Sequence, residues 1–310
     1  MTLDELCEVF NVQRKKFIPC KDLWKEKLHL CRDLTLAQIG APLGYHMGES
    51  FLQCPHSVFW KNAIWLWAVW ANQTPETTDK AYDYRSSDAL GKALMAGIES
   101  GNPADAVSHY ESIIATDEMT VADVNLMSAL ERELSQRVTL ILKKIYALNP
   151  TEVEFERKFE WTAPPCGDKP ALTYNGAADI VVHAPLGPFI IEVKNTDNPG
   201  WIINHSGQVD YYCRLGRATG FTTGGGYYYL LPGWLHGNIN GSFGGINHAY
   251  SVQSEPAHDG SATPYIRAIN TLAEIPLNPD LWALPDKYIN RCKTCQVRRY
   301  CYPQGLPTGY

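Results

Sequence analysis

The chain has 310 residues, of which 45% are hydrophobic and 19% charged, so it is globular and long enough for one large domain or two ordinary ones. Its net charge of −6 excludes a global basic field, and a nucleic-acid partner would need local basic patches such as residues 14–16, 143–144 and 298–299. The longest apolar run, residues 63–71, is too short to span a bilayer. The first residues also lack the hydrophobic segment of a signal peptide, so we expect a cytoplasmic protein.

The first 150 residues show helical periodicity, and the clearest helix is predicted over residues 121–148, where Asn149-Pro150 ends it. From residue 151 the pattern changes to short runs rich in β-branched residues. In chain order it predicts strands over 153–161, 178–183 and 189–194, a helix over 207–215, and strands over 224–231 and 248–252. A short helix and a cysteine-containing tail follow from residue 279. The order indicates an α/β domain with additional helices.

Two carboxylates and a lysine interrupt the predicted central strands. Because side chains alternate between the faces of a strand, Glu192 and Lys194 share a face, and Val193 points into the core. If residues 184–188 form a hairpin, Asp179 can approach Glu192 across the pair. Phosphodiester hydrolysis needs such a patch, in which oxygen ligands hold Mg²⁺ and a cation stabilises the developing charge.

The bland alternative is a solvated strand face with a cross-strand ion pair, because Glu and Lys are common residues. The apolar residues that flank the motif (Ile180, Val181, Ile190 and Ile191) weigh against it, since charges in a buried strand are costly without a role.

Nine cysteines in a reducing compartment favour metal ligation over disulfides where the cysteines cluster. The spacing of three cysteines in the tail would let them coordinate one metal centre: Cys292, Cys295 and Cys301. Cys54 is the candidate for the fourth ligand. At this point zinc and an iron–sulfur cluster are both open. Most of the remaining cysteines are interpreted as small core residues; these are Cys7, Cys20, Cys31, Cys166 and Cys213.

Taken in order, these motifs resemble the RecB-like PD-(D/E)XK nucleases that carry an iron–sulfur cluster, a family that includes AddB-type, CRISPR-adaptation and phage exonucleases. The resemblance spans residues 46–303. It starts from Cys54-Pro55, continues through Gly91-x3-Met95-x3-Glu99 and the carboxylate–lysine motif, and adds Gln208-x3-Tyr212 before the cysteine tail.

The resemblance implies a metal-dependent DNA nuclease, acting as an exonuclease with Mg²⁺ or Mn²⁺. Asp179, Glu192 and the carbonyl of Val193 would hold the metal, and Lys194 would act on the attacking water. Gln208 and Tyr212 would help to position DNA and the active-site face. The four cysteines Cys54, Cys292, Cys295 and Cys301 would hold a [4Fe–4S] cluster.

One position departs from the family pattern, because Met95 stands where the family has histidine. A thioether is a poor ligand for a hard cation, so Glu99, one turn along, is the candidate to replace it as a metal ligand. His109 and His183 are interpreted as surface or hydrogen-bonded histidines.

The implied fold is a restriction-endonuclease-like core, a mixed central sheet flanked by helices. Residues 1–45 would form a helical N-terminal extension and 46–310 the nuclease domain, divided into a helical part (46–150), a catalytic core (151–270) and a cluster-binding tail (271–310). DNA is the expected partner, with other recombination or CRISPR-adaptation proteins as further candidates and no membrane. The alternative is a catalytically weakened nuclease fold, kept as a DNA-binding or partner subunit.

Overall fold

The computed structural model describes ten segments of the chain: residues 35–38, 43–59, 87–114, 121–167, 170–195, 202–221, 225–231, 253–256, 260–276 and 281. The chain divides into two compact units. Unit 1 combines residues 1–81, 160–176 and 263–310, and unit 2 combines residues 82–159 and 177–262. The predicted extension 1–45 and the cysteine tail lie almost entirely outside the described residues.

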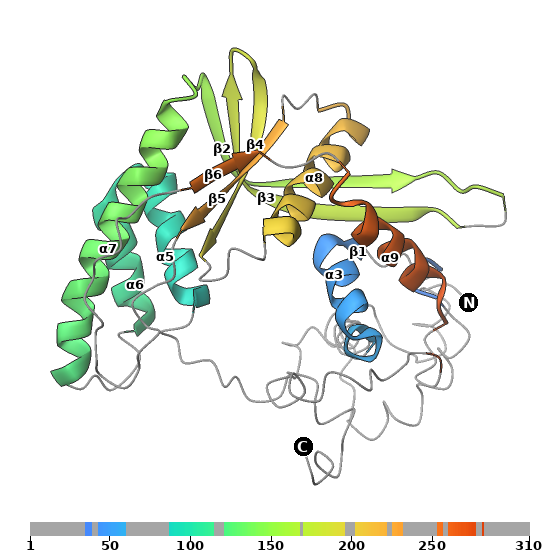
Figure 1. The fold of residues 1–310 in the computed structure, drawn as a ribbon, viewed down its shortest axis with the longest axis horizontal. Helices are drawn as coiled ribbons and strands as arrows, with labels where there is room; N and C mark the ends of the chain where they lie inside the picture. Colours follow the sequence, from blue (N-terminus) through green and yellow to red (C-terminus); the bar gives the residue numbers. More distant parts are fainter. Residues whose placement is uncertain are drawn as a thin grey trace, which may run out of the picture. The chain divides into compact units, whose positions relative to one another are not determined.

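Unit 2 is built on a mixed β-sheet (Figure 1). β3 (Leu172–Ala184) turns into β4 (Gly187–Asn195), and the two strands pair antiparallel, with Ala184 opposite Gly187. β4 then pairs in parallel with β5 (Gly225–Leu231), a connection that requires a crossover, supplied by α8 (Ile202–Ala218). β6 (Gln253–Pro256) adds antiparallel to β5, and β2 (Glu152–Ala163) pairs with β3.

In the described part of unit 2, three helices precede β2: α5 (Ser87–Ser100), α6 (Pro103–Ile114) and α7 (Val121–Tyr146). Gly101 ends α5 in the left-handed conformation, at φ 70°, which glycine adopts without a steric penalty. Asn102 then caps α6, because its Oδ1 accepts from the N–H of Ala104, and Pro103 opens the new helix. The short sequence between the helices therefore turns the chain back so that α6 packs along α5.

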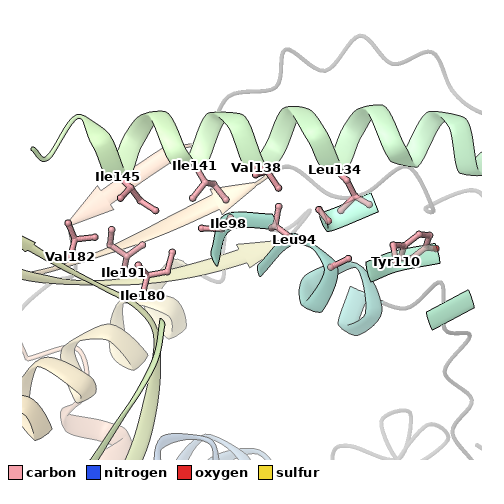
Figure 2. Close-up of a cluster of buried hydrophobic side chains, with 12 residues drawn as sticks. Leu94, Ile98, Tyr110, Leu134, Val138, Ile141, Ile145, Ile180, Val182 and Ile191 are labelled. Atoms are coloured by element: carbon pink, nitrogen blue, oxygen red, sulfur yellow. The ribbon is translucent and has the colours of Figure 1, made fainter. Parts of the chain in front are cut away.

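The core of unit 2 lies between these helices and one face of the sheet (Figure 2). α7 contributes a stripe at helical spacing, Leu134, Val138, Ile141 and Ile145, all at most 2% exposed. Figure 2 shows this stripe above α5 and the strands. The cluster also contains Leu94, Ile98, Tyr110, Ile180, Val182 and Ile191. Because strands alternate, Asp179 and Glu192 belong to the opposite face, which α8 covers.

The structure confirms the α/β class, with a mixed sheet flanked by helices. The predicted helix over 121–148 is α7, and the strand over 224–231 is β5. β3 is longer than the predicted strand over 178–183, because Leu172 to Gly176 continue its extended backbone. The strand predicted over 248–252 lies outside the described residues.

Unit 1 has a small core around two helices, α3 (Tyr45–Gln53) and α9 (Thr263–Glu274). Gly48 allows their close approach, since a Cβ there would lie 2.5 Å from the carbonyl oxygen of Tyr265. The rings of Tyr45 and Tyr265 also pack, with centroids 4.7 Å apart. β1 (Leu43–Gly44) pairs in parallel with the part of β3 at Tyr174 and Asn175. Across the described segments, none of the helices has the length and apolar character needed to cross a membrane.

Gly97 tests how tightly the helices of unit 2 pack. A Cβ on Gly97 would lie 2.6 Å from the Cβ of Ala106 and 2.8 Å from Cγ2 of Val138. Gly97→Ala should therefore push α5 away from α6 and α7 and lower the free energy of unfolding by about 1–3 kcal/mol.

The matched control is Gly91→Ala in the same helix, where a Cβ meets nothing within 4 Å. That substitution should stabilise the protein by up to about 1 kcal/mol through helix propensity. Urea denaturation of both variants measures the difference, and equal stabilities would contradict the close packing.

Candidate active site

A buried carboxylate lies at the centre of the candidate site. Glu192 of β4 is only 1% exposed. Its Oε1 accepts from Nζ of Lys194 at 2.6 Å and from Nε2 of Gln208 at 2.7 Å. Its Oε2 is buried and has no hydrogen-bond partner among the described residues. Burying an oxygen without a partner is costly, so this atom marks a place where a ligand would be stabilising.

Asp179 of β3 supplies the second carboxylate. Its Oδ2 accepts from the backbone N–H of Val193 at 2.9 Å, which links β3 to β4. The hairpin register explains this contact. Ile180 lies opposite Ile191, and Asp179 is one residue further from the turn than Ile180. The predicted approach of Asp179 to the Glu192 motif is therefore present in the structure.

The two carboxylates and the lysine set the charge state of the site. The pKa of Glu192 is raised to about 7, chiefly by burial, with Lys194 opposing the rise and the negative charge of Asp179 adding to it. Lys194 is the partner nearer to solvent, with 26% of its side chain exposed. The cluster therefore holds one carboxyl group near the point of protonation and has a solvent-facing cation beside it.

α8 provides the other wall of the site. Gln208 and Tyr212 lie one turn apart on this helix, and Nε2 of Gln208 also donates to the hydroxyl of Tyr212 at 3.0 Å. Each side chain is 4% exposed. Burial raises the pKa of the Tyr212 hydroxyl far above its usual range, and the negative charge of Glu192 adds to this, so the hydroxyl stays protonated.

These residues fit a hard divalent cation. Asp179 and Glu192 offer carboxylate oxygens, and Oε2 of Glu192 is without a partner among the residues that the structure describes. Val193 lies between Glu192 and Lys194 on β4. No group of three or more His, Cys, Asp or Glu side chains suited to a metal occurs within the described segments. A pair of carboxylates nevertheless suits Mg²⁺, which is usually bound by one or two carboxylates together with waters and substrate phosphates.

The structure places Met95 and Glu99 of α5 away from this cluster. Met95 is partly buried and packs against the hydrophobic core, on the sheet face opposite Glu192. Glu99 is exposed and lines a shallow hollow with Asp105 and His109 of α6. The role of Glu99 as a metal ligand stays a prediction that these positions do not favour.

The cysteines are only partly described. Cys54 follows α3 and is half-buried, and its Sγ accepts from the backbone N–H of Ser57 at 3.4 Å. Its predicted partners Cys292, Cys295 and Cys301 lie outside the described residues. Cys213 is buried in α8, as expected for a core residue. Cys166 is exposed in the connection between β2 and β3, so it is not one of the core cysteines.

Asp210 is a residue of this region that the sequence reasoning missed. It is buried on α8, where Oδ2 accepts from the N–H of Ala262 at 2.9 Å and both carboxylate oxygens accept from Nε of Arg214. Asp210 therefore fixes α8 from the side that faces away from Glu192. An Asp-x3-Arg pair at helical spacing was the available signal. His183, by contrast, pairs with Glu154, as expected for a hydrogen-bonded histidine.

Comparisons with known proteins add little. No family model matches the chain, and no curated protein matches it. Among solved structures, the chain is similar to the crystal structure of SSO0001, at 14% sequence identity and a TM-score of 0.33. The match covers 69% of this chain and 85% of that one. A likeness this slight establishes neither fold nor function.

Substitution of Met95 by histidine tests whether this position packs against the core or replaces a lost metal ligand. Because its side chain packs against the hydrophobic core of unit 2, Met95→His would bury an imidazole there. We expect the free energy of unfolding to fall by about 1–3 kcal/mol, with no gain in metal affinity. Denaturation and a Mn²⁺ titration of the same variant measure both quantities. Tighter Mn²⁺ binding with unchanged stability would place α5 at the metal site instead.

Proposed function

We propose that this protein is a metal-dependent DNA nuclease of the PD-(D/E)XK class, acting as an exonuclease. The observation that carries the proposal is the buried Glu192: Lys194 donates to one of its oxygens, the other has no partner in the described part of the chain, and Asp179 lies beside it. The mixed sheet flanked by helices is compatible with the restriction-endonuclease-like core that this class uses.

The burial of Glu192 separates this proposal from a surface ion pair. An exposed Glu–Lys pair contributes little to stability and needs no special position. Glu192 is almost completely buried, and burial disfavours its charged form, as the raised pKa shows. Such a costly arrangement is typical of functional sites, where titratable groups lie together with perturbed pKa values.

The proposed roles follow from the positions of the side chains. Asp179, Glu192 and the carbonyl of Val193 would hold Mg²⁺ or Mn²⁺, which supplies a bound water of lowered pKa and neutralises charge on the phosphate. Lys194 is partly exposed beside Glu192, so it can orient the attacking water or donate to a phosphate oxygen. Asp179 is held at the strand by Val193, which keeps its carboxylate from rotating away.

DNA binding at this site would depend on local cations, since the net charge is −6. Lys143 and Lys144 are exposed near the end of α7, one of the three basic patches expected from the sequence. The other two patches, residues 14–16 and 298–299, lie outside the described segments.

The same proposal includes a [4Fe–4S] cluster held by Cys54, Cys292, Cys295 and Cys301. Cys54 suits this role because its sulfur is half-buried and accepts a backbone N–H, the kind of hydrogen bond that stabilises cluster thiolates. The cluster would connect two segments far apart in the sequence, so its binding free energy would contribute to folding.

A catalytically weakened binding subunit is the competing function. It drew its support from Met95 in place of the family histidine. In the structure Met95 is partly buried and packs against the hydrophobic core, whereas Asp179, Glu192 and Lys194 come together on one sheet face. The geometry therefore supports the enzyme better than the binding subunit.

Glu192 and Lys194 provide the direct test of activity. Glu192→Gln and Lys194→Met should each lower Mn²⁺-dependent cleavage of end-labelled DNA by about 100-fold or more, because both remove charge from the reacting centre. Glu111→Gln and Lys158→Met are matched controls, since both residues are exposed on other elements of unit 2. Full activity of both site variants would contradict the proposal.

The cluster is tested by colour and metal content. Cys54→Ala and Cys301→Ala should lose the brown absorbance and the bound iron, and should increase sensitivity to protease. Cys166→Ser is the control, because this exposed cysteine is not among the proposed ligands. Elemental analysis of the wild-type protein decides between metals, and bound zinc in place of iron would overturn the cluster.

A further inference from the structure

Gln208 links Glu192 to Tyr212 through a single nitrogen. Its Nε2 donates to Oε1 of Glu192 at 2.7 Å and to the hydroxyl of Tyr212 at 3.0 Å. A carboxamide nitrogen carries two protons, so these two bonds use both of them. Rotating the amide by half a turn would place its oxygen against the Glu192 carboxylate. The two acceptors therefore fix the orientation of the Gln208 amide.

The hydrogen bonds to Glu192 are distributed unequally between its two oxygens. Oε1 accepts from both Gln208 and Lys194, whereas Oε2 has no partner among the described residues. A carboxylate held in this way cannot exchange its oxygens without losing both bonds. One oxygen is fixed by the protein, and the other is left for a cation.

Gln208 and Lys194 differ in how firmly they can hold Oε1. Gln208 is 4% exposed and anchored by Tyr212, and α8 is itself fixed by Asp210. Lys194 has a long flexible side chain that is 26% exposed and reaches solvent. If Lys194 moves to a water or a phosphate oxygen during the reaction, Gln208 is the donor that remains on Glu192.

We propose that Gln208 and Tyr212 are positioning residues, which hold Oε1 of Glu192 so that Oε2 is presented to a divalent cation. This inference rests on the proposed function and makes one part of it specific, because the sequence resemblance gave these residues a general role in positioning DNA and the active-site face. Both side chains are almost completely buried, so they act on the Glu192 carboxylate from within the protein rather than on a bound DNA strand.

Two substitutions remove the hydrogen bonds that hold Oε1 of Glu192 to different extents. Gln208→Met keeps the length and volume of the side chain but removes both donated hydrogen bonds. Tyr212→Phe removes one oxygen, the acceptor that fixes the amide. Tyr211→Phe is the matched control, since Tyr211 precedes Tyr212 on α8, is about as deeply buried, and packs its ring edge to face against that of Tyr212.

The test measures Mn²⁺ binding to the full chain without DNA, by calorimetry or by the electron paramagnetic resonance signal of free Mn²⁺. Groups that orient a metal ligand typically change metal affinity by about 10- to 100-fold, and we expect this loss for Gln208→Met. Tyr212→Phe should weaken binding by about 2- to 10-fold, the effect of one hydrogen bond, and Tyr211→Phe should leave it unchanged.

Cleavage assays supply the second readout. If Gln208 only positions the carboxylate, Gln208→Met should raise the half-saturating Mn²⁺ concentration while its rate at saturating Mn²⁺ stays near that of the wild type. A purely structural role would instead lower the thermal unfolding midpoint without this split. Unchanged Mn²⁺ affinity in both Gln208→Met and Tyr212→Phe would overturn the inference.

Glu192→Ala separates that failure from failure of the proposed function. If Glu192→Ala abolishes Mn²⁺ binding and both α8 variants bind normally, the nuclease proposal stands and the positioning role is wrong. If Glu192→Ala also binds Mn²⁺ and cleaves DNA as the wild type does, the proposed metal site itself is wrong. Should Gln208→Met not fold, Tyr212→Phe alone decides, because it removes a single atom.

Discussion

The arrangement of the candidate site depends on one constraint: the carboxylate of Glu192 lies on the sheet face that α8 covers. Glu192 is buried between β4 and α8, so its charge cannot be solvated by bulk water. Hydrogen bonds from Lys194 and from Gln208, whose amide also donates to the Tyr212 hydroxyl, compensate for part of that loss. Oε2 of Glu192 has no hydrogen-bond partner within the described segments, and for this reason the same arrangement that costs stability can hold a cation.

The two faces of the sheet have different roles, one in stabilising the fold and the other in forming the candidate site. One face joins α5, α6 and α7 in a hydrophobic cluster, and the other carries the polar residues under α8. α8 has two roles as well, because Gln208 and Tyr212 point to Glu192 while Asp210 binds the backbone at Ala262. The contact between Asp210 and Ala262 thus supports the helix that carries Gln208 and Tyr212 without involving a substrate.

Much of this arrangement followed from the sequence, and the limits have physical causes. Alternation in β4 predicted that Glu192 and Lys194 share a face, and the Pro/Gly turn predicted the hairpin that brings Asp179 close. The sequence match at Met95 did not reveal that its side chain packs against the hydrophobic core, since periodicity shows which residues share a helix face but not which element that face meets. The hydrogen bond from the N–H of Ala262 to Asp210 could not be predicted, because Ala262 lies far along the chain.

The alternation of β4 also limits how this chain can change in length during evolution. Ile191 belongs to the hydrophobic cluster and Glu192 to the polar face, although they are neighbours in the sequence. Deletion of one residue between the hairpin turn and Glu192 would exchange their faces, placing a carboxylate in the core and an isoleucine beside Gln208. Insertions and deletions should therefore accumulate at the exposed turn around Leu186, while the length of the strand that follows stays fixed.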